Sequence, residues 1–342
     1  MIVRVTTPSR LHFGLFSFGR TDGRQHGGVG AMLERPGVRL TIERAERTAA
    51  SGPLAERAVE FTNRVVQTLA ASRLADGDSQ HRTDSDPQPA PGDSPGAKRR
   101  GYQIVIEAAP PDHVGLGTGT QLGLAIAAGI LRLNGQEIWS SGELAYVTGR
   151  GGRSGIGTYG FLRGGLLMEA GKLPGETLSP LIARVEPPPA WRFVLLRPTD
   201  AVGLSGTDEQ RAFADLPPVP ESVTQKLCTE AELHLFPAAM ENDFAAFSRS
   251  LGSYSRLAGE CFAARQGGPF AGQTAARLVK LLKSLGVEGV GQSSWGPTLF
   301  ALQPDQAAAE ILATKLRSLA DAPLEIIISP PANRGATIGF EG

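Results

Sequence analysis

Arginines and glycines gather in the segment 149-GRGGRSGIGTYGF-161, a composition typical of an anion-binding loop. Arg150 and Arg153 can each present a planar fork of donors to an oxyanion, and the Ser154 hydroxyl can donate as well. The glycines would let the backbone come close to such a ligand. Because the segment holds no carboxylate, it predicts a site that stabilises negative charge without supplying a carboxylate base.

A second glycine-rich stretch, 113-HVGLGTGTQLG-123, lies between a predicted strand and a predicted helix. The positive end of that helix and the backbone N–H groups of the stretch would face an anion. Those groups belong to Gly115, Gly117, Thr118, Gly119 and Thr120. A tight turn would give the same pattern by chance, and the lysine of a Walker loop and the repeats of a Rossmann fold are missing. We therefore predict a phosphate-binding loop of another kind.

Two basic side chains, Arg10 and His12, lie in 8-PSRLHFGLFSFG-19. Alternate residues of an extended chain share a face, so these two side chains point the same way. With Arg20 and Arg24 close in sequence, they indicate a clamp for a phosphate or a carboxylate. A surface ion pair and a structural histidine are the simpler alternative.

Neutral hydrogen-bonding groups and one large aromatic ring lie together in 289-GVGQSSWGPTLF-300. Gln292, Ser293 and Ser294 could bind a polar ligand, and Trp295 could form a flat apolar wall. Trp295 could equally be a core residue.

Composition excludes several classes of function. Lys plus Arg and Asp plus Glu both number 34 in 342 residues, so no global charge would attract nucleic acid or an anionic membrane. Cys228 and Cys261 are too few for a disulfide framework or a thiolate zinc site. No apolar run reaches the length of about 18 residues that a membrane span needs. We expect a cytoplasmic protein that binds neither nucleic acid nor membranes, and the sequence leaves a homodimer open.

The elements of the first half are predicted from hydrophobic periodicity and helix caps. Residues 75 to 100 lack large apolar side chains, and we expect a disordered surface insertion there. The predicted strands are 2–7, 38–44 (antiparallel to the first), 102–108 and 165–171, and the predicted helices are 53–74, 120–133 and 140–149.

In the second half, the predicted strands and helices follow one another in the order of a split βαβ layer. Its predicted strands are 191–197, 287–291, 297–302 and 324–329, with helices within 220–262, 272–285 and 304–319. The proline-rich segment 187-PPPA-190 marks a domain boundary. We predict an α+β protein with one domain over 1–187 and a ferredoxin-like domain over 188–342.

These motifs together resemble the GHMP small-molecule kinase superfamily. The segments that carry the resemblance are 6-TPSRLHFGLF-15 and 114-VGLGTGTQLGLAIAAG-129. The arginine–glycine segment and 289-GVGQSSWGPT-298 are most similar to the β-ribofuranosylaminobenzene 5′-phosphate synthase family. The resemblance implies the two-domain GHMP fold, with a ribosomal-protein-like N-terminal domain.

That resemblance also implies an activity. Such a pentosyltransferase condenses phosphoribosyl pyrophosphate with 4-hydroxybenzoate or 4-aminobenzoate, releasing carbon dioxide and pyrophosphate, in the synthesis of methanopterin-type one-carbon carriers. Mg²⁺ would arrive with the pyrophosphate, and no ATP would be needed. Gly157 stands where the kinases usually carry an aspartate, which argues against phosphoryl transfer.

Roles for individual residues follow from this reaction. The 115–120 loop, Arg150, Arg153 and Ser154 would bind the pyrophosphate or the 5-phosphate. Arg10 would bind a carboxylate or phosphate, and His12 would act as a base for the phenol proton. Trp295, Gln292, Ser293 and Ser294 would shape the aromatic pocket. An ATP-dependent small-molecule kinase and a non-catalytic ligand sensor of the same fold remain the alternatives.

Overall fold

The computed structural model describes residues 1–77, 101–136, 139–199 and 211–341. Most of the predicted insertion, residues 78–100, lies outside the described residues. Residues 75–77 form the end of a helix, contrary to the disorder expected there. Within the described ranges, no helix is long and apolar enough to span a bilayer.

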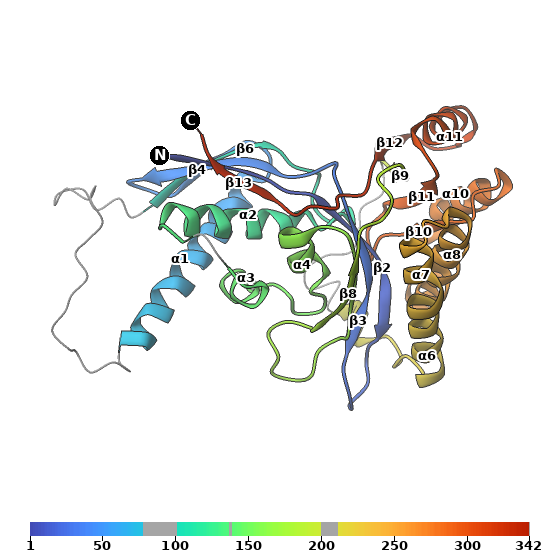
Figure 1. Cartoon of the computed structure of the whole chain (residues 1–342), viewed down its shortest axis with the longest axis horizontal. Helices are drawn as coiled ribbons and strands as arrows, with labels where there is room; N and C mark the ends of the chain where they lie inside the picture. Colours follow the sequence, from blue (N-terminus) through green and yellow to red (C-terminus); the bar gives the residue numbers. More distant parts are fainter. Residues whose placement is uncertain (78–100, 137–138, 200–210, 342) are drawn as a thin grey trace.

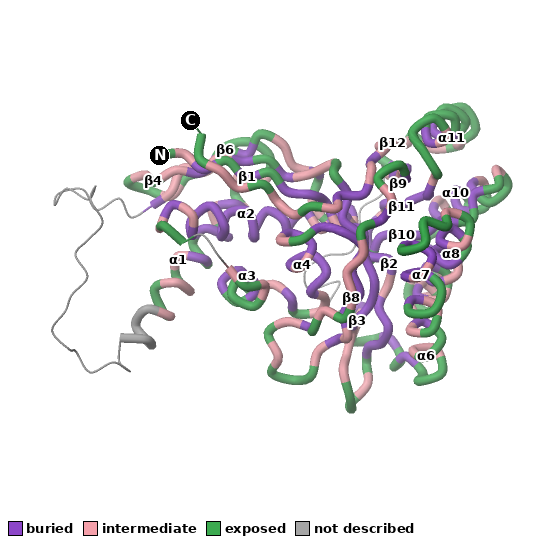
Figure 2. The backbone as a smooth tube through the Cα atoms, viewed as in Figure 1, coloured by how far each residue is buried: buried purple, intermediate pink, exposed green. Residues whose placement is uncertain are grey.

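The first sheet and its helices form one end of the molecule (Figure 1). Its strand order is β13-β1-β4-β6-β5, with β1 and β4 antiparallel as predicted. Helices α1 and α2 pack together against it, and α2 is apolar on nearly all sides because it is buried over almost its whole length (Figure 2). The bounds are β1 Ile2–Thr6, β4 Arg39–Ala45, β5 Ala49–Ser51, β6 Gly101–Ala108, β13 Thr337–Phe340, α1 Ala55–Gly77 and α2 Thr118–Leu133.

The second sheet stands in the middle of the molecule, with the order β2-β3-β7-β8 (Figure 1). Its strands are β2 Ser9–Ser17, β3 His26–Leu33, β7 Leu166–Glu169 and β8 Leu181–Val185. Gly14 in β2 faces helix α8 (Phe244–Glu260) so closely that an added Cβ would lie 2.2 Å from the Cβ of Ala258. A residue without a side chain is therefore required at this contact.

The third sheet has the order β10-β11-β9-β12, as the split βαβ arrangement requires. The predicted ferredoxin-like layer is therefore confirmed. Its strands are β9 Arg192–Pro198, β10 Val290–Gln292, β11 Leu299–Gln303 and β12 Leu324–Ser329. Its helical elements are α6 Glu221–Thr229, the π-helical turn η1 Glu230–Leu235, α7 Phe236–Met240, α8, α9 Ala263–Gln266, α10 Gly272–Ser284 and α11 Gln306–Leu319.

Two features of the structure differ from what the sequence predicted. Strand β13 returns to pair with β1, so the end of the chain belongs to the first sheet and not to a domain running from 188 to 342. The arginine–glycine segment is only partly a loop, because helix α4 (Ile156–Arg163) begins inside it. The short helix α3 (Ser141–Thr148) has the predicted capping box between Ser140 and Glu143 and ends at Gly149.

Candidate functional site

A cavity of about 920 Å³ lies where the three sheets meet. Strand β2, the start of α2, the 149–154 segment, the C-terminal part of α8 and the turn after β10 all contribute to its walls. It is lined by most of the residues predicted for the site, namely Arg10, His12, Gly115, Gly117, Thr118, Gly119, Thr120, Arg150, Arg153, Ser154, Gln292, Ser294 and Trp295. The tertiary structure therefore brings four separate sequence motifs to one place.

One end of the cavity is formed by the N-terminus of α2. Gly117 precedes this helix with a φ of 69° and has no side-chain cap. The Thr120 N–H donates to the Gly117 carbonyl oxygen at 3.0 Å, so the N–H groups of Thr118 and Gly119 are the donors that the first turn can offer a ligand. Arg150 reaches over this end and donates from Nη2 to the carbonyl oxygen of Gly119 at 3.2 Å. Its guanidinium also lies 4.8 Å from the ring centre of Phe61. The arrangement has the donors that an oxyanion needs.

Sequence reasoning missed a further arginine at this end. Arg57 of α1 lines the cavity and stacks over Phe61 at 5.6 Å, beside Arg150. Its ion pair with Asp112 holds it at the rim, where His113 Nε2 lies 3.3 Å from Arg57 Nη1. The sequence did contain a signal for this arginine: Arg57 and Arg64 are seven residues apart and therefore lie on one face of α1.

Positive charge accumulates at this end of the cavity. Burial lowers the pKa of Arg150 to about 10, and the neighbouring charges of Arg57, Arg64 and Arg10 contribute to the shift. Burial also lowers the pKa of Arg57. Asp112 offsets the charge of Arg57, and the remaining guanidinium charge makes this end electrostatically suited to an anion.

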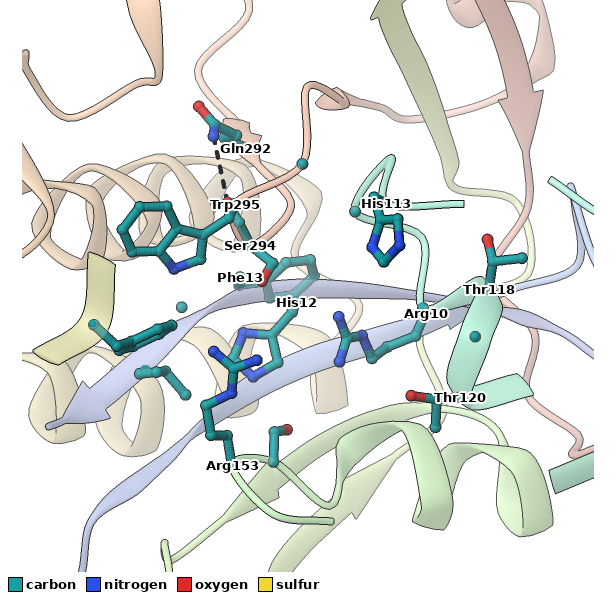
Figure 3. A pocket seen from close by; sticks show the side chains of 18 of the residues that line it. Arg10, His12, Phe13, His113, Thr118, Thr120, Arg153, Gln292, Ser294 and Trp295 are labelled. Atoms are coloured by element: carbon teal, nitrogen blue, oxygen red, sulfur yellow. Dashed lines mark hydrogen bonds between the residues drawn. The ribbon is translucent and has the colours of Figure 1, made fainter. Parts of the chain in front are cut away.

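Arg10, His12 and Arg153 converge in the middle of the cavity (Figure 3). His12 is 4% exposed, and its Nε2 has no hydrogen-bond partner among the described residues. Burial, followed by the charges of Arg10, Arg153 and His26, holds the pKa of His12 well below 6.5. The imidazole is therefore neutral at neutral pH and can accept a proton from a ligand.

The opposite end of the cavity is aromatic. Trp295 packs against Phe213 and Phe262 with ring centres 5.3 and 5.1 Å apart. The Arg153 guanidinium lies 4.7 Å from the ring centre of Phe213, between the aromatic end and the charged centre. Figure 3 shows Trp295 on one side of Arg10 and His12, and Thr118 and Thr120 on the other. The cavity thus has a cationic end and an aromatic end.

Ser293 was predicted for the site but does not line the cavity. It is fully buried, and its hydroxyl donates to the carbonyl oxygen of Gly115 at 2.6 Å and accepts from the His12 N–H at 3.0 Å. Nearby, a Cβ on Gly296 would lie 2.2 Å from the Gly115 nitrogen. Ser293 therefore joins the phosphate loop to β2 instead of touching a ligand.

Some side chains that were predicted to bind a ligand bond to other parts of the protein instead. Arg20 pairs with Glu221 and Arg24 with Glu176, so neither extends the clamp around Arg10. Gln292 lines the cavity, but its Oε1 accepts from the Ala271 N–H and its Nε2 donates to the Ser294 carbonyl oxygen. Its role in the cavity wall is mainly structural.

A buried carboxylate missed in the sequence supports the arginine–glycine segment. Glu169 of β7 is fully buried and accepts from the Gly155 N–H through Oε2 at 2.6 Å. Burial raises its pKa, against the opposing effects of hydrogen bonds from Ser154, Gly155 and Ser179. The carboxylate lies behind the segment and fixes the start of α4.

The two cysteines, Cys228 and Cys261, are free and half-buried, and neither lines the cavity. Burial raises the pKa of Cys261 to about 11, which leaves the thiol protonated and unreactive at neutral pH. In the described part of the chain, no group of three or more His, Cys, Asp or Glu residues could hold a metal ion.

The fold defines the class of protein. A sequence profile of the family described as GHMP kinases C terminal matches residues 235–322. Phosphomevalonate kinase from Streptococcus pneumoniae superposes with a TM-score of 0.65 at 12% identity, covering 97% of this chain and 100% of that one. Homoserine kinase from Cytophaga hutchinsonii gives a TM-score of 0.62 at 15% identity, covering 98% and 97%. The chain has the GHMP kinase fold.

Within that class, the chain is similar over nearly its full length to β-ribofuranosylphenol 5′-phosphate synthases. The synthase of Methanothermobacter thermautotrophicus is 28% identical, with 97% of each chain covered. The synthase of Archaeoglobus fulgidus is 29% identical, with 90% of this chain and 89% of that one covered. The resemblance indicated by the four motifs is confirmed.

Proposed function

We propose that this protein is a decarboxylating phosphoribosyltransferase. It joins phosphoribosyl pyrophosphate to 4-hydroxybenzoate or 4-aminobenzoate and releases carbon dioxide and pyrophosphate, in the synthesis of methanopterin-type carriers. The observation that carries this proposal is the division of one cavity into a cationic end and an aromatic end, with Arg10, His12 and Arg153 between them. The similarity to the ribofuranosylphenol phosphate synthases supports it.

The charged end stabilises the leaving group. As the bond between the anomeric carbon and the pyrophosphate breaks, its electron pair moves to the pyrophosphate. Preorganised guanidinium and backbone donors stabilise that developing charge. Arg150, Arg57 and the first turn of α2 supply these donors. The same groups bind phosphate oxygens and not a cation, so Mg²⁺ enters chelated by the pyrophosphate.

The aromatic end presents the acceptor. Ring electrons, pushed by the para substituent, form the new bond from the carboxylate-bearing carbon to the anomeric carbon. Loss of carbon dioxide then returns the electrons of the broken carbon–carbon bond to the ring, so no base has to remove a ring proton. Arg10 and Arg153 orient the carboxylate, and neutral His12 lies beside these two arginines, close to the carboxylate and not to the para substituent.

The test is release of carbon dioxide from carboxyl-labelled 4-hydroxybenzoate or 4-aminobenzoate with phosphoribosyl pyrophosphate and Mg²⁺, without ATP. We expect release that depends on both substrates. Arg153→Ala should lower kcat/KM by about 100-fold or more, because it removes a charge-assisted donor in the transition state. Arg163→Ala, an exposed arginine of α4 outside the cavity, is the matched control.

Absence of release from folded protein with either acid would contradict the proposal. Consumption of ATP with a small alcohol would instead identify a kinase, and binding of phosphoribosyl pyrophosphate without turnover would identify a sensor.

A further inference from the structure

Two buried polar atoms without hydrogen-bond partners among the described residues belong to side chains that line the aromatic end of the cavity. Ser255 is 4% exposed and Trp295 is 9% exposed, and both line the cavity. Neither Ser255 Oγ nor Trp295 Nε1 has a hydrogen-bond partner among the described residues. A buried polar atom without a partner costs free energy, so two of them in one cavity wall indicate contacts that a ligand completes.

Ser255 belongs to a face of α8 that the sequence motifs did not include. Ser255, Ala258 and Gly259 of α8 line the cavity, together with Phe262 just after the end of the helix. Phe262 also packs on Trp295, which places this face at the aromatic end.

The orientation of the acceptor follows from the proposed function. The carboxylate-bearing carbon must face the anomeric carbon, next to the departing pyrophosphate and the arginines. The para substituent, across the ring, must then face away from α2, toward the wall formed by α8 and Trp295. We propose that Ser255 and Trp295 recognise the para substituent of the aromatic acid by hydrogen bonds, and that the Trp295 N–H favours a hydroxyl over an amino group at this position.

The chemistry of the two groups differs in a way that gives selectivity. A serine hydroxyl can accept a hydrogen bond from a phenol O–H or from an aromatic N–H, so Ser255 serves both acids. The indole N–H can only donate. A phenol oxygen retains lone pairs that accept from it, whereas the lone pair of an aromatic amine is delocalised into the ring and accepts poorly. The two glutamines of this wall contribute less, because Gln292 and Gln266 already bond to the backbone.

The experiment compares binding of 4-hydroxybenzoate, 4-aminobenzoate and unsubstituted benzoate to the full chain by calorimetry, with no sugar substrate present. Wild-type protein should bind 4-hydroxybenzoate most tightly. Trp295→Phe keeps the aromatic wall and should reduce the ratio of the 4-hydroxybenzoate to the 4-aminobenzoate affinity about fivefold to tenfold, the range of one hydrogen bond. Ser255→Ala should weaken both para-substituted acids to a similar extent and leave benzoate unchanged.

Two matched variants control for changes in the fold. Trp191→Phe removes an indole N–H from the core, and Ser248→Ala removes a buried hydroxyl from the same helix; neither residue lines the cavity. Both should keep the wild-type ratios. A ratio of two affinities does not depend on the fraction of folded protein, so a partly unfolded variant still gives an answer.

The outcomes separate this inference from the proposed function. Para-dependent binding that Trp295→Phe and Ser255→Ala alter as described supports the inference, even if wild-type protein releases no carbon dioxide. Unaltered ratios in both variants, equal losses for all three acids, or no binding of any acid to wild-type protein would overturn it. Turnover by wild-type protein would leave the proposed function standing in each of those cases.

Discussion

At the scale of single residues, the site is characterised by buried guanidinium groups. Arg150 is the clearest example, because burial and three neighbouring arginines together lower its pKa to about 10. A lowered pKa of a base means that the folded state disfavours its charged form. The charged Arg150 guanidinium thus destabilises the ligand-free protein, and a bound anion would offset this cost.

We expect Arg150→Met to raise the free energy of unfolding by roughly 1–2 kcal/mol, because it removes like-charge repulsion and keeps an unbranched apolar stem over Phe61. The same change should largely remove the rise in melting temperature that pyrophosphate gives to wild-type protein, since the ligand stabilises only the state that binds it. Thermal unfolding with and without pyrophosphate measures both effects. Arg163→Met is the matched control; a less stable Arg150→Met protein that keeps the full pyrophosphate shift would refute this account.

At the scale of elements, the site depends on contacts between segments that are far apart in sequence. Ser293 joins the phosphate loop to β2 through Gly115 and His12, and the Gly115 and Gly296 backbones touch beside it. Glu169 fixes the start of α4 in the same manner. Buried hydrogen bonds from distant segments therefore hold the site motifs in place.

Ser293→Ala should lower the free energy of unfolding by about 1–3 kcal/mol, because it leaves the buried His12 N–H and Gly115 carbonyl oxygen without this partner. It should also lower turnover, since both the loop and His12 lose their common support. Urea unfolding and the carbon dioxide assay measure the two effects. The exposed neighbour Ser294 is the control: Ser294→Ala should leave stability within about 0.5 kcal/mol of wild type. Equal stability of the two variants would count against this role of Ser293.

At the scale of the whole molecule, the two halves share one core. The largest hydrophobic cluster contains Leu11 and Val29 from the second sheet together with Phe193, Phe247 and Phe300 from the C-terminal half. Phe13 lies 5.2 Å from Phe300 between ring centres. Strand β13 adds a further connection by joining the first sheet. A cavity between two parts that unfold together keeps its geometry without a bound ligand.

We therefore expect a single unfolding transition. A variant that keeps only Trp139, in the first half, and one that keeps only Trp191, in the second, should report the same urea midpoint by fluorescence. Phe13→Ala should lower both midpoints together, by an amount equivalent to about 3–5 kcal/mol, because it empties the shared core. Separate midpoints, or a shift in only one of them, would mean that the halves unfold independently.

The sequence by itself determined the elements and the chemical character of the site. Alternating and helical periodicity placed β1, β4, β6, α1, α2 and the ferredoxin-like half, because burial on one face imposes these repeats locally. The glycine and arginine motifs predicted anion binding because glycine lets backbone N–H groups approach a ligand and arginine supplies charged donors. The proline-rich segment 187–190 predicted two domains, and the resemblance to the GHMP kinases implied the same arrangement.

The tertiary structure alone decided which groups meet. The packing of α1 brings Arg57 close to Arg150. The packing of α8 and the sheets makes Ser255 line the cavity and leaves Ser293 bonded within its wall. It also pairs Arg20 and Arg24 with carboxylates outside the site. The return of β13 to β1 likewise joins the two ends of the chain. Local periodicity carries no information on such pairings, because they arise from long-range packing that many residues determine together.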